Sequence, residues 1–435
     1  MQFVSGSGPF GDDDPFAGMA AMFNQFIGAF GGGGTAISWD HAKQMAGSIA
    51  NGGDPEPNVD PVERIRIEQL ARVAELHVTQ ATGLQIPSAG GIVTIEAVTR
   101  AQWAAATLDA YRTLFEQLTT SLGAVMREQL DDVEPDDITA LGGGMGDEDA
   151  AAFLAGLSQM LGPMMLSMMA GSTVGHLGLR AFGSYDLPIP RPATEPVLVV
   201  AANLDGFAED WGIPPDDLRL WICLEELAHR AVLGVPHVRA RISELLAAHA
   251  AGFAADPTAI ESRLGDVDLD GPAGLDALQS LLSDPDVVLG AIRSPAQQAL
   301  LPQLDAIVTV VEGYVDHVID GISEHLIASA PQLSEALRRR RVETDQASRF
   351  VERLFGLELT QEKLDRGQAF VAGVIDRAGA GAMERLWSGS DGLPTPAEVD
   401  APGLWLARVG IATDQPLPEL ADDEFEVPDF PDLDD

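Results

Sequence analysis

Helical periodicity extends over most of this chain of 435 residues. From residue 61 to about residue 412, apolar residues recur at the three- and four-residue spacing of helices, as in "PVERIRIEQLARVAELHVTQATG". One β-branched run, "VLVVAAN" at residues 197–203, follows a Pro-rich stretch and predicts a strand. The sequence therefore predicts a mainly α protein with at most a small β element.

The two ends of the chain differ from this helical part in composition. Residues 1–60 are rich in Gly and Asp, which predicts a flexible arm without a core of its own. Within the arm, residues 16–30 carry an apolar stripe that predicts one short amphipathic helix. Residues 413–435 combine Pro with many acidic residues, which predicts a disordered acidic tail. We expect residues 61–412 to form the folded domain.

The net charge narrows the range of partners. Asp and Glu outnumber Lys and Arg by 67 to 26, and the resulting charge of −41 repels nucleic acid and anionic membrane surfaces. Cys223 is the only cysteine, which excludes intrachain disulfides and cysteine-rich zinc modules. The first nine residues contain no Lys or Arg, unlike a signal peptide. We therefore expect a cytoplasmic protein that does not bind nucleic acid.

Residues 150–179 contain no Asp, Glu, Lys or Arg and are long enough to span a bilayer. Five glycines and Pro163 make the run only mildly hydrophobic, and no cluster of Lys or Arg flanks it. The composition favours a helical hairpin in the core of a soluble protein over a membrane span.

A helix is predicted at residues 218–233, between a Pro-Pro-Asp-Asp segment and a Gly. Apolar residues surround this helix almost completely, which indicates that it is buried. Glu225 and His229 share one stripe of the helix. A buried carboxylate or imidazole is costly unless it is paired or binds a metal. Either Glu225 and His229 satisfy each other, with Glu226 bridged to Arg230, or they belong to a metal site.

The segment "EELAH", residues 225–229, differs by one side chain from the His-Glu-x-x-His motif of zinc peptidases. In that motif the two histidines bind zinc, and the Glu after the first one polarises the attacking water. Here Glu226 keeps the position of the base and His229 that of the second ligand, while Glu225 replaces the first histidine. A carboxylate binds zinc, but its charge lowers the Lewis acidity of the metal. A zinc site here is expected to be weaker or differently tuned.

A second helix offers a third ligand. Ser294 and Gln297 resemble a capping box at its start, and an acidic series follows the apolar run "AIVTVV". Glu312, Asp316 and Asp320 align in this series at i, i+4 and i+8. Glu312 is the candidate ligand. The alternative is a helix that emerges into solvent at Glu312.

Two weaker motifs indicate no further chemistry. Residues 265–277 begin like a calcium-binding loop, but Ala277 stands where the bidentate Glu is required, which favours a solvated acidic turn. Residues 338–341, "RRRR", are the one basic run of the chain. In so acidic a protein we expect these arginines to pair with local carboxylates.

The stretches "DDLRLWICLEELAHRAVLGVPHVR", "SPAQQALLPQLDAIVTVVEGYVDHVID" and "RLFGLELTQEKLDRGQAFVAGVIDRAG" resemble the zincin-like type 2 metallopeptidases. This family is common in actinobacteria, and some members are described as associated with deazaflavin coenzyme biosynthesis. The resemblance implies a zincin-like helical body, with Glu226 as general base and His229 and Glu312 as zinc ligands. Glu225 falls where the family has its first zinc histidine, and Tyr314 where many relatives have a histidine.

Two functions follow from these observations. The first is a zinc-dependent peptidase or related hydrolase, with Glu225, His229 and Glu312 as ligands and Glu226 as base. The second is a catalytically inactive pseudopeptidase that keeps the fold and binds a peptide or protein partner through its groove, arm or tail.

Overall fold

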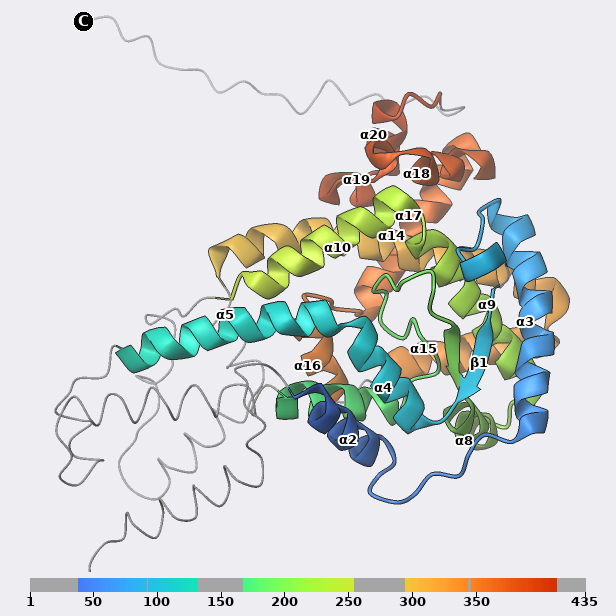
Figure 1. Cartoon of the computed structure of the whole chain (residues 1–435). Coiled ribbons are helices and arrows are strands. Elements are labelled where there is room, and N and C mark those ends of the chain that lie inside the picture. The colour runs from blue at the N-terminus through green and yellow to red at the C-terminus, as the bar shows by residue number, and fades with distance from the viewer. Residues whose placement is uncertain (1–37, 92, 132–166, 254–293, 343–345, 413–435) are drawn as a thin grey trace, which may run out of the picture. The chain divides into compact units, whose positions relative to one another are not determined.

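The computed structural model describes the greater part of the chain, namely residues 38–91, 93–131, 167–253, 294–342 and 346–412. Within these ranges the protein is mostly helical and contains one two-stranded sheet (Figure 1). The mainly α fold class is therefore confirmed.

Several predicted features lie outside the described residues. They are the amphipathic helix at 16–30, the first part of the uncharged stretch at 150–166, the calcium-like loop at 265–277 and the acidic tail at 413–435. The remainder of the uncharged stretch is helical from residue 167 to residue 178.

The first elements along the chain are α2 (Trp39–Ala50), α3 (Pro61–Thr82), η1 (Ala89–Gly91), β1 (Ile95–Val98), α4 (Arg100–Ala110), α5 (Arg112–Asp131), β2 (Val197–Val200), α8 (Ala201–Trp211), α9 (Pro215–Leu233) and α10 (Pro236–Ala251). They are followed by α14 (Pro295–Leu326), α15 (Ala330–Val342), α16 (Gln346–Leu354), α17 (Gln361–Ala378), η2 (Ala380–Met383), α18 (Glu384–Ser388), η3 (Ser390–Gly392), α19 (Pro396–Asp400) and α20 (Pro402–Arg408).

Helix α2 lies within the stretch that composition assigns to the arm. Ala42, Ala46 and Ala50 of α2 are fully buried against α4 and the helical segment at 167–178. This helix buries small alanines instead of large apolar side chains, and it lies between Gly-rich segments whose composition favours an arm. The folded part of the chain therefore extends back at least to Trp39, instead of beginning at residue 61.

Helix α9 begins at Pro215, with two acidic residues in its first turn, and ends at Leu233 before Gly234. It packs against α3, α8 and α14, and nearly all its side chains from Leu218 onward are buried. The predicted helix at 218–233 and its burial are both confirmed. Glu225 is the half-buried exception in this stretch.

Helix α14 carries the predicted capping box. Ser294 accepts a hydrogen bond from the amide of Gln297, whose side chain accepts one from the amide of Ser294. The helix packs against α9, α10 and α17, and Figure 1 shows α10 and α14 running side by side. A Cβ atom on Gly313 would lie 2.2 Å from the carbonyl carbon of Gly367 in α17. The backbones of α14 and α17 thus touch at a point where only glycine fits, which fixes the position of the neighbouring Glu312.

The sheet pairs β1 and β2 in parallel, from Ile95 opposite Val197 to Val98 opposite Val200. The strand predicted at 197–203 is shorter, because the chain turns into α8 at Ala201. On the other side of β2, residues 182–184 run antiparallel to it, with the amide of Ser184 donating to the carbonyl of Leu198 at 3.1 Å. This pairing brings residues 182–186 next to α9.

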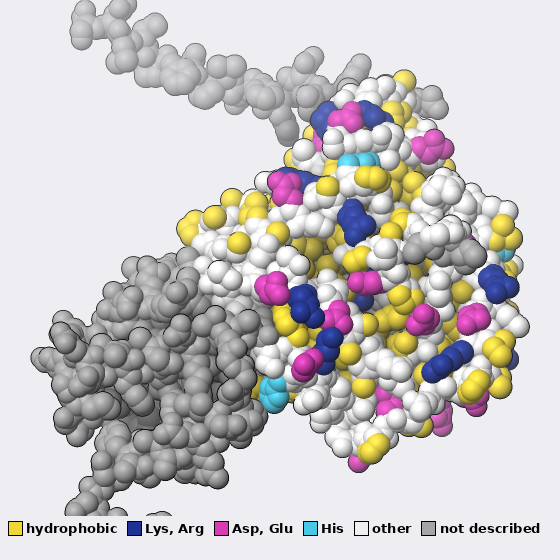
Figure 2. All heavy atoms as spheres, viewed as in Figure 1, with side chains coloured by type: hydrophobic (Ala, Val, Ile, Leu, Met, Phe, Trp, Pro, Cys, Tyr) yellow, Lys and Arg dark blue, Asp and Glu magenta, His cyan; other side chains and the backbone are white. Residues whose placement is uncertain are grey.

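Charges of both signs are spread over the face drawn in Figure 2. On its described part, Lys and Arg side chains lie among Asp, Glu and apolar ones and do not gather into a single patch. Among the described helices, none has the length and apolar character that a membrane span requires.

Candidate active site between α9, α14 and α15

Helices α9 and α14 place His229 and Glu312 face to face. His229 Nε2 lies 2.9 Å from Glu312 Oε1, and both side chains are buried. His229 Nδ1 lies 3.0 Å from the backbone carbonyl oxygen of Glu225, one turn earlier. Since a carbonyl oxygen only accepts, Nδ1 must carry a proton there, and an ionised Glu312 requires a second proton at Nε2. His229 and Glu312 therefore form a buried imidazolium–carboxylate pair.

The protonation of this pair follows from its surroundings. Burial lowers the pKa of His229, but the carboxylates of Glu312, Glu225 and Glu226 outweigh it and raise that pKa to about 9. Burial raises the pKa of Glu312, but His229 and Arg341 outweigh it, so that this pKa falls below its usual value. The two buried charges stabilise each other.

Glu225 directs its side chain away from this pair. Its Oε1 atom accepts a hydrogen bond of 2.8 Å from Nη2 of Arg341 in α15. Nη1 of the same guanidinium lies 3.2 Å from each carboxylate oxygen of Asp316 in α14. Gln368 of α17 donates to Asp316 at 3.0 Å. One guanidinium thus links carboxylates of α9 and α14.

Glu226 is buried and contacts backbone. It accepts hydrogen bonds from the amide of Ser184 at 2.8 Å and from the amide of Tyr185 at 3.2 Å. Gly183 permits this approach, because a Cβ atom there would lie 2.2 Å from the Glu226 carboxyl group. Burial raises the pKa of Glu226 to about 8, against the opposing charge of His229. The ring of Tyr185 stacks on His229, with 6.0 Å between ring centroids.

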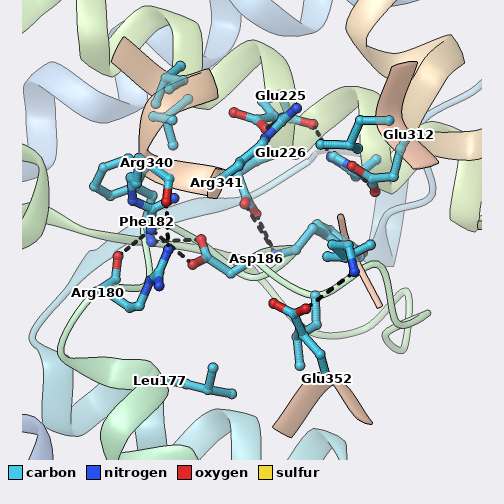
Figure 3. Close-up of a pocket in the computed structure, with 17 residues that line it drawn as sticks. Leu177, Arg180, Phe182, Asp186, Glu225, Glu226, Glu312, Arg340, Arg341 and Glu352 are labelled. Atoms are coloured by element: carbon cyan, nitrogen blue, oxygen red, sulfur yellow. Dashed lines mark hydrogen bonds and ion pairs between the residues drawn. The ribbon is translucent and has the colours of Figure 1, made fainter. Parts of the chain in front are cut away.

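These residues surround a cavity of about 80 Å³ (Figure 3). Its polar lining combines five carboxylates, three guanidiniums and one imidazole, and leucine, isoleucine and aromatic side chains complete the wall. The polar residues are Arg180, Asp186, Glu225, Glu226, His229, Glu312, Arg340, Arg341 and Glu352. Positive charges therefore face negative ones across a small space.

The structure brings together some of the predicted site residues. His229 and Glu312 meet directly, and Glu226 lines the same cavity. Glu225 contacts His229 only through its backbone oxygen, because its carboxylate binds Arg341. Since Glu312 is buried, α14 does not emerge into solvent there.

The ion pair expected between Glu226 and Arg230 does not form, and Tyr314 lies apart from the site. Arg230 does not bridge to Glu226 but donates to the carbonyl oxygens of Pro87, Ala193 and Glu195, since these loop carbonyls need buried donors. Tyr314 packs against Trp387, with 4.8 Å between ring centroids.

Arg341 is the principal residue of the site that the motif around Glu225 does not predict. The available signal is the basic run at 338–341, and its expected pairing with carboxylates is confirmed for Arg339, Arg340 and Arg341. Arg339 binds Glu335, Arg340 binds Asp186, and Arg341 binds Glu225 and Asp316. Two of these carboxylates lie far from their arginines in the sequence. Asp186 is 154 residues from Arg340, and Glu225 is 116 residues from Arg341.

Comparison with known proteins gives two matches. The sequence pattern of the zincin-like metallopeptidase family matches residues 37–406. A crystal structure from Chloroflexus aurantiacus, described as a candidate hydrolase with a novel fold, superposes with a TM-score of 0.57 at 21% identity. That alignment covers 86% of this chain and 99% of the other. At this identity the likeness concerns the fold alone. Among curated proteins, none matches the chain.

Zincins hold zinc through three protein ligands around one point. The described residues contain no group of three His, Cys, Asp or Glu side chains arranged in that way. Glu312 is paired with His229, and Glu225 is held by a guanidinium whose charge would repel a metal ion. In this arrangement the side chains do not fit a zinc ion.

Proposed function

The chain belongs to the zincin-like metallopeptidase family, and we propose that it is a non-catalytic member of that family. In this proposal the peptidase site has become a closed set of ion pairs. The fold then serves to bind a peptide or protein partner instead of cleaving one.

The observation that carries this proposal is the ion pair between Glu225 and Arg341. Glu225 occupies the position of the first zinc histidine, and Arg341 keeps its carboxylate away from His229 and Glu312. A guanidinium stays charged at every physiological pH, so the pair cannot be released by deprotonation of Arg341.

The surroundings of Glu226 support the same proposal. A general base needs an ionised carboxylate oxygen within reach of the attacking water. Both oxygens of Glu226 instead accept backbone hydrogen bonds, and burial favours the protonated acid. Glu226 is then a structural side chain that anchors the segment containing Ser184 and Tyr185 to α9.

A second candidate is a zinc-dependent hydrolase with Glu225, His229 and Glu312 as ligands and Glu226 as base. One observation favours it. His229 already lies against Glu312, and its Nδ1 is fixed by a backbone carbonyl, which is how proteins orient zinc-binding imidazoles. This candidate requires Glu225 to leave Arg341.

Metal analysis combined with a peptidase assay tests the two candidates. We expect protein purified without a His tag to contain no stoichiometric zinc and to leave a fluorogenic peptide library intact. The Glu226→Gln variant and a control, Glu244→Gln at an exposed site of α10, should then both resemble the wild type. Stoichiometric zinc together with hydrolysis that only Glu226→Gln abolishes would establish the hydrolase and reject our proposal.

A further inference from the structure

Arg341 joins helices that the chain brings together from distant segments. From α15 it reaches Glu225 of α9 at 2.8 Å and Asp316 of α14 at 3.2 Å. Gln368 of α17 adds a hydrogen bond to Asp316. The Arg341 side chain is only 27% exposed, so solvent screens these interactions weakly. A single cation thus connects three helices directly and a fourth through Asp316.

The balance of charge at the site depends on this cation. Glu225 and Glu312 occupy two of the positions that the family uses for metal ligands, and each is paired with a protein cation. Glu312 is paired with His229, and Glu225 with Arg341. The single positive charges of His229 and Arg341 therefore balance part of the negative charge of Glu225, Glu312 and Asp316, which a divalent ion would otherwise balance.

Arg341 differs in this respect from its neighbours in the basic run. Arg339 pairs with Glu335, four residues earlier in the same helix, and its side chain is 60% exposed. Arg340 binds Asp186 and covers the ring of Phe182, with its guanidinium carbon 3.7 Å from the ring centroid. Of these three arginines, Arg341 is the one that pairs with Glu225.

We infer that the guanidinium of Arg341 takes the place of a metal cation: it holds α9, α14 and α15 together and excludes divalent ions from the site. This inference rests on the proposed function, because it assumes a metal-free wild type. Removing the guanidinium leaves Glu225 and Asp316 without their cation, beside His229 and Glu312. The variant should therefore be less stable without metal and should bind a divalent ion.

The test compares Arg341→Met with Arg339→Met, which removes an arginine two positions away in the same helix. Both are purified without a tag in metal-free buffer, and the Tm is measured before and after addition of zinc chloride. We expect the Tm of Arg341→Met to lie about 4 °C below that of Arg339→Met and to recover with zinc. Titration calorimetry should detect one zinc ion per chain in Arg341→Met. Arg341→Lys, which keeps the charge, should bind none.

Equal Tm values for the two methionine variants, with no response to zinc, would overturn the inference. If Arg341→Met does not fold, the double variant Glu225→Gln/Arg341→Met decides. We expect this variant to fold, because it removes both charges of the pair. Failure of the double variant to fold would count against the inference.

The proposed function is judged separately, from the wild type. Zinc-free, inactive wild type together with unresponsive Arg341→Met would leave the proposed function standing and remove only this inference. Zinc-dependent hydrolysis by the wild type would reject the proposed function. The Tm difference in metal-free buffer would still report whether Arg341 joins the helices.

Discussion

Helix α14 has two contrasting sides at adjacent residues. On one side, Gly313 touches the backbone of Gly367 in α17, and there is no room for a side chain. On the other side, Glu312 joins a polar network that includes His229 and lies beside a cavity. The first contact depends on shape and is independent of pH. The second depends on charge, so that it can change through substitution of single side chains while the helix stays in place.

The largest expected effect is on the glycine side. Gly313→Ala would force a methyl group into the backbone of α17, and we expect the free energy of unfolding to fall by about 3 kcal/mol. The control is Gly321→Ala in the same helix, where a new Cβ meets no atom within 4 Å. Because alanine favours helix, the control should be neutral or slightly stabilising. Urea denaturation of both variants measures the difference, and equal stabilities would contradict the close contact.

A smaller loss is expected on the polar side. Glu312→Gln keeps the size of the side chain but removes the charge that stabilises protonated His229. We expect a loss of about 2 kcal/mol, below the range for breaking a buried ion pair outright, because the amide oxygen still accepts a hydrogen bond. The pKa of His229, followed by NMR, should fall. Glu324→Gln, the same substitution at an exposed site of the same helix, should leave both quantities unchanged.

The pH dependence of stability should separate the two sides most clearly. The pKa of Glu226 is about 8, above its usual 4.5, because of burial. The pKa of His229 is about 9, above its usual 6.5, because the neighbouring carboxylates outweigh burial. Each raised pKa contributes stability that is complete below the usual value and is lost as the pH rises through the folded value. We therefore expect stability to fall between pH 4.5 and 8 through Glu226 and between pH 6.5 and 9 through His229, and most steeply between pH 6.5 and 8, where both contributions are being lost.

The slope of the unfolding free energy against pH distinguishes the glycine contact of α14 from its polar network. Gly313→Ala should lower the unfolding free energy equally at all pH values, because it leaves the titrating groups in place. Glu312→Gln should lose the part of the slope that comes from His229. Urea denaturation at several pH values between 6 and 9.5 measures both, and a flat profile for the wild type would contradict the assigned charge states.

The parts that the sequence predicted well are those with local signals. The Pro-Pro-Asp-Asp start of α9 and the capping box at Ser294 both act within a few residues of the element they begin. The burial of His229 also followed from the apolar residues around it in its own helix. The burial of Glu312 did not, because the sequence also allowed a helix that emerges into solvent there. The two helix starts and the burial of His229 need no knowledge of the remote chain.

The missed features depend on remote partners or weak patterns. Strand β1 has four residues and is defined by pairing with β2 about 100 residues later. The bonds of Glu226 to Ser184 and Tyr185 leave no mark in the motif around Glu226, and neither does the partner of Glu225 in α15. The sequence of the "EELAH" segment does not indicate whether Arg341 binds Glu225. Side chains of opposite charge are common, and sequence spacing alone does not select among them.

The parallel pairing of β1 and β2 has a consequence for how the chain folds. Joining these strands closes a loop of about 100 residues, and such non-local contacts form slowly compared with helices. Residues 182–184, where the amide of Ser184 donates a hydrogen bond to Glu226, pair with the other side of β2. The position of these residues therefore depends on the strand being in place. We therefore expect the helices to appear early in refolding and the cavity around Glu226 to be completed in the slowest phase.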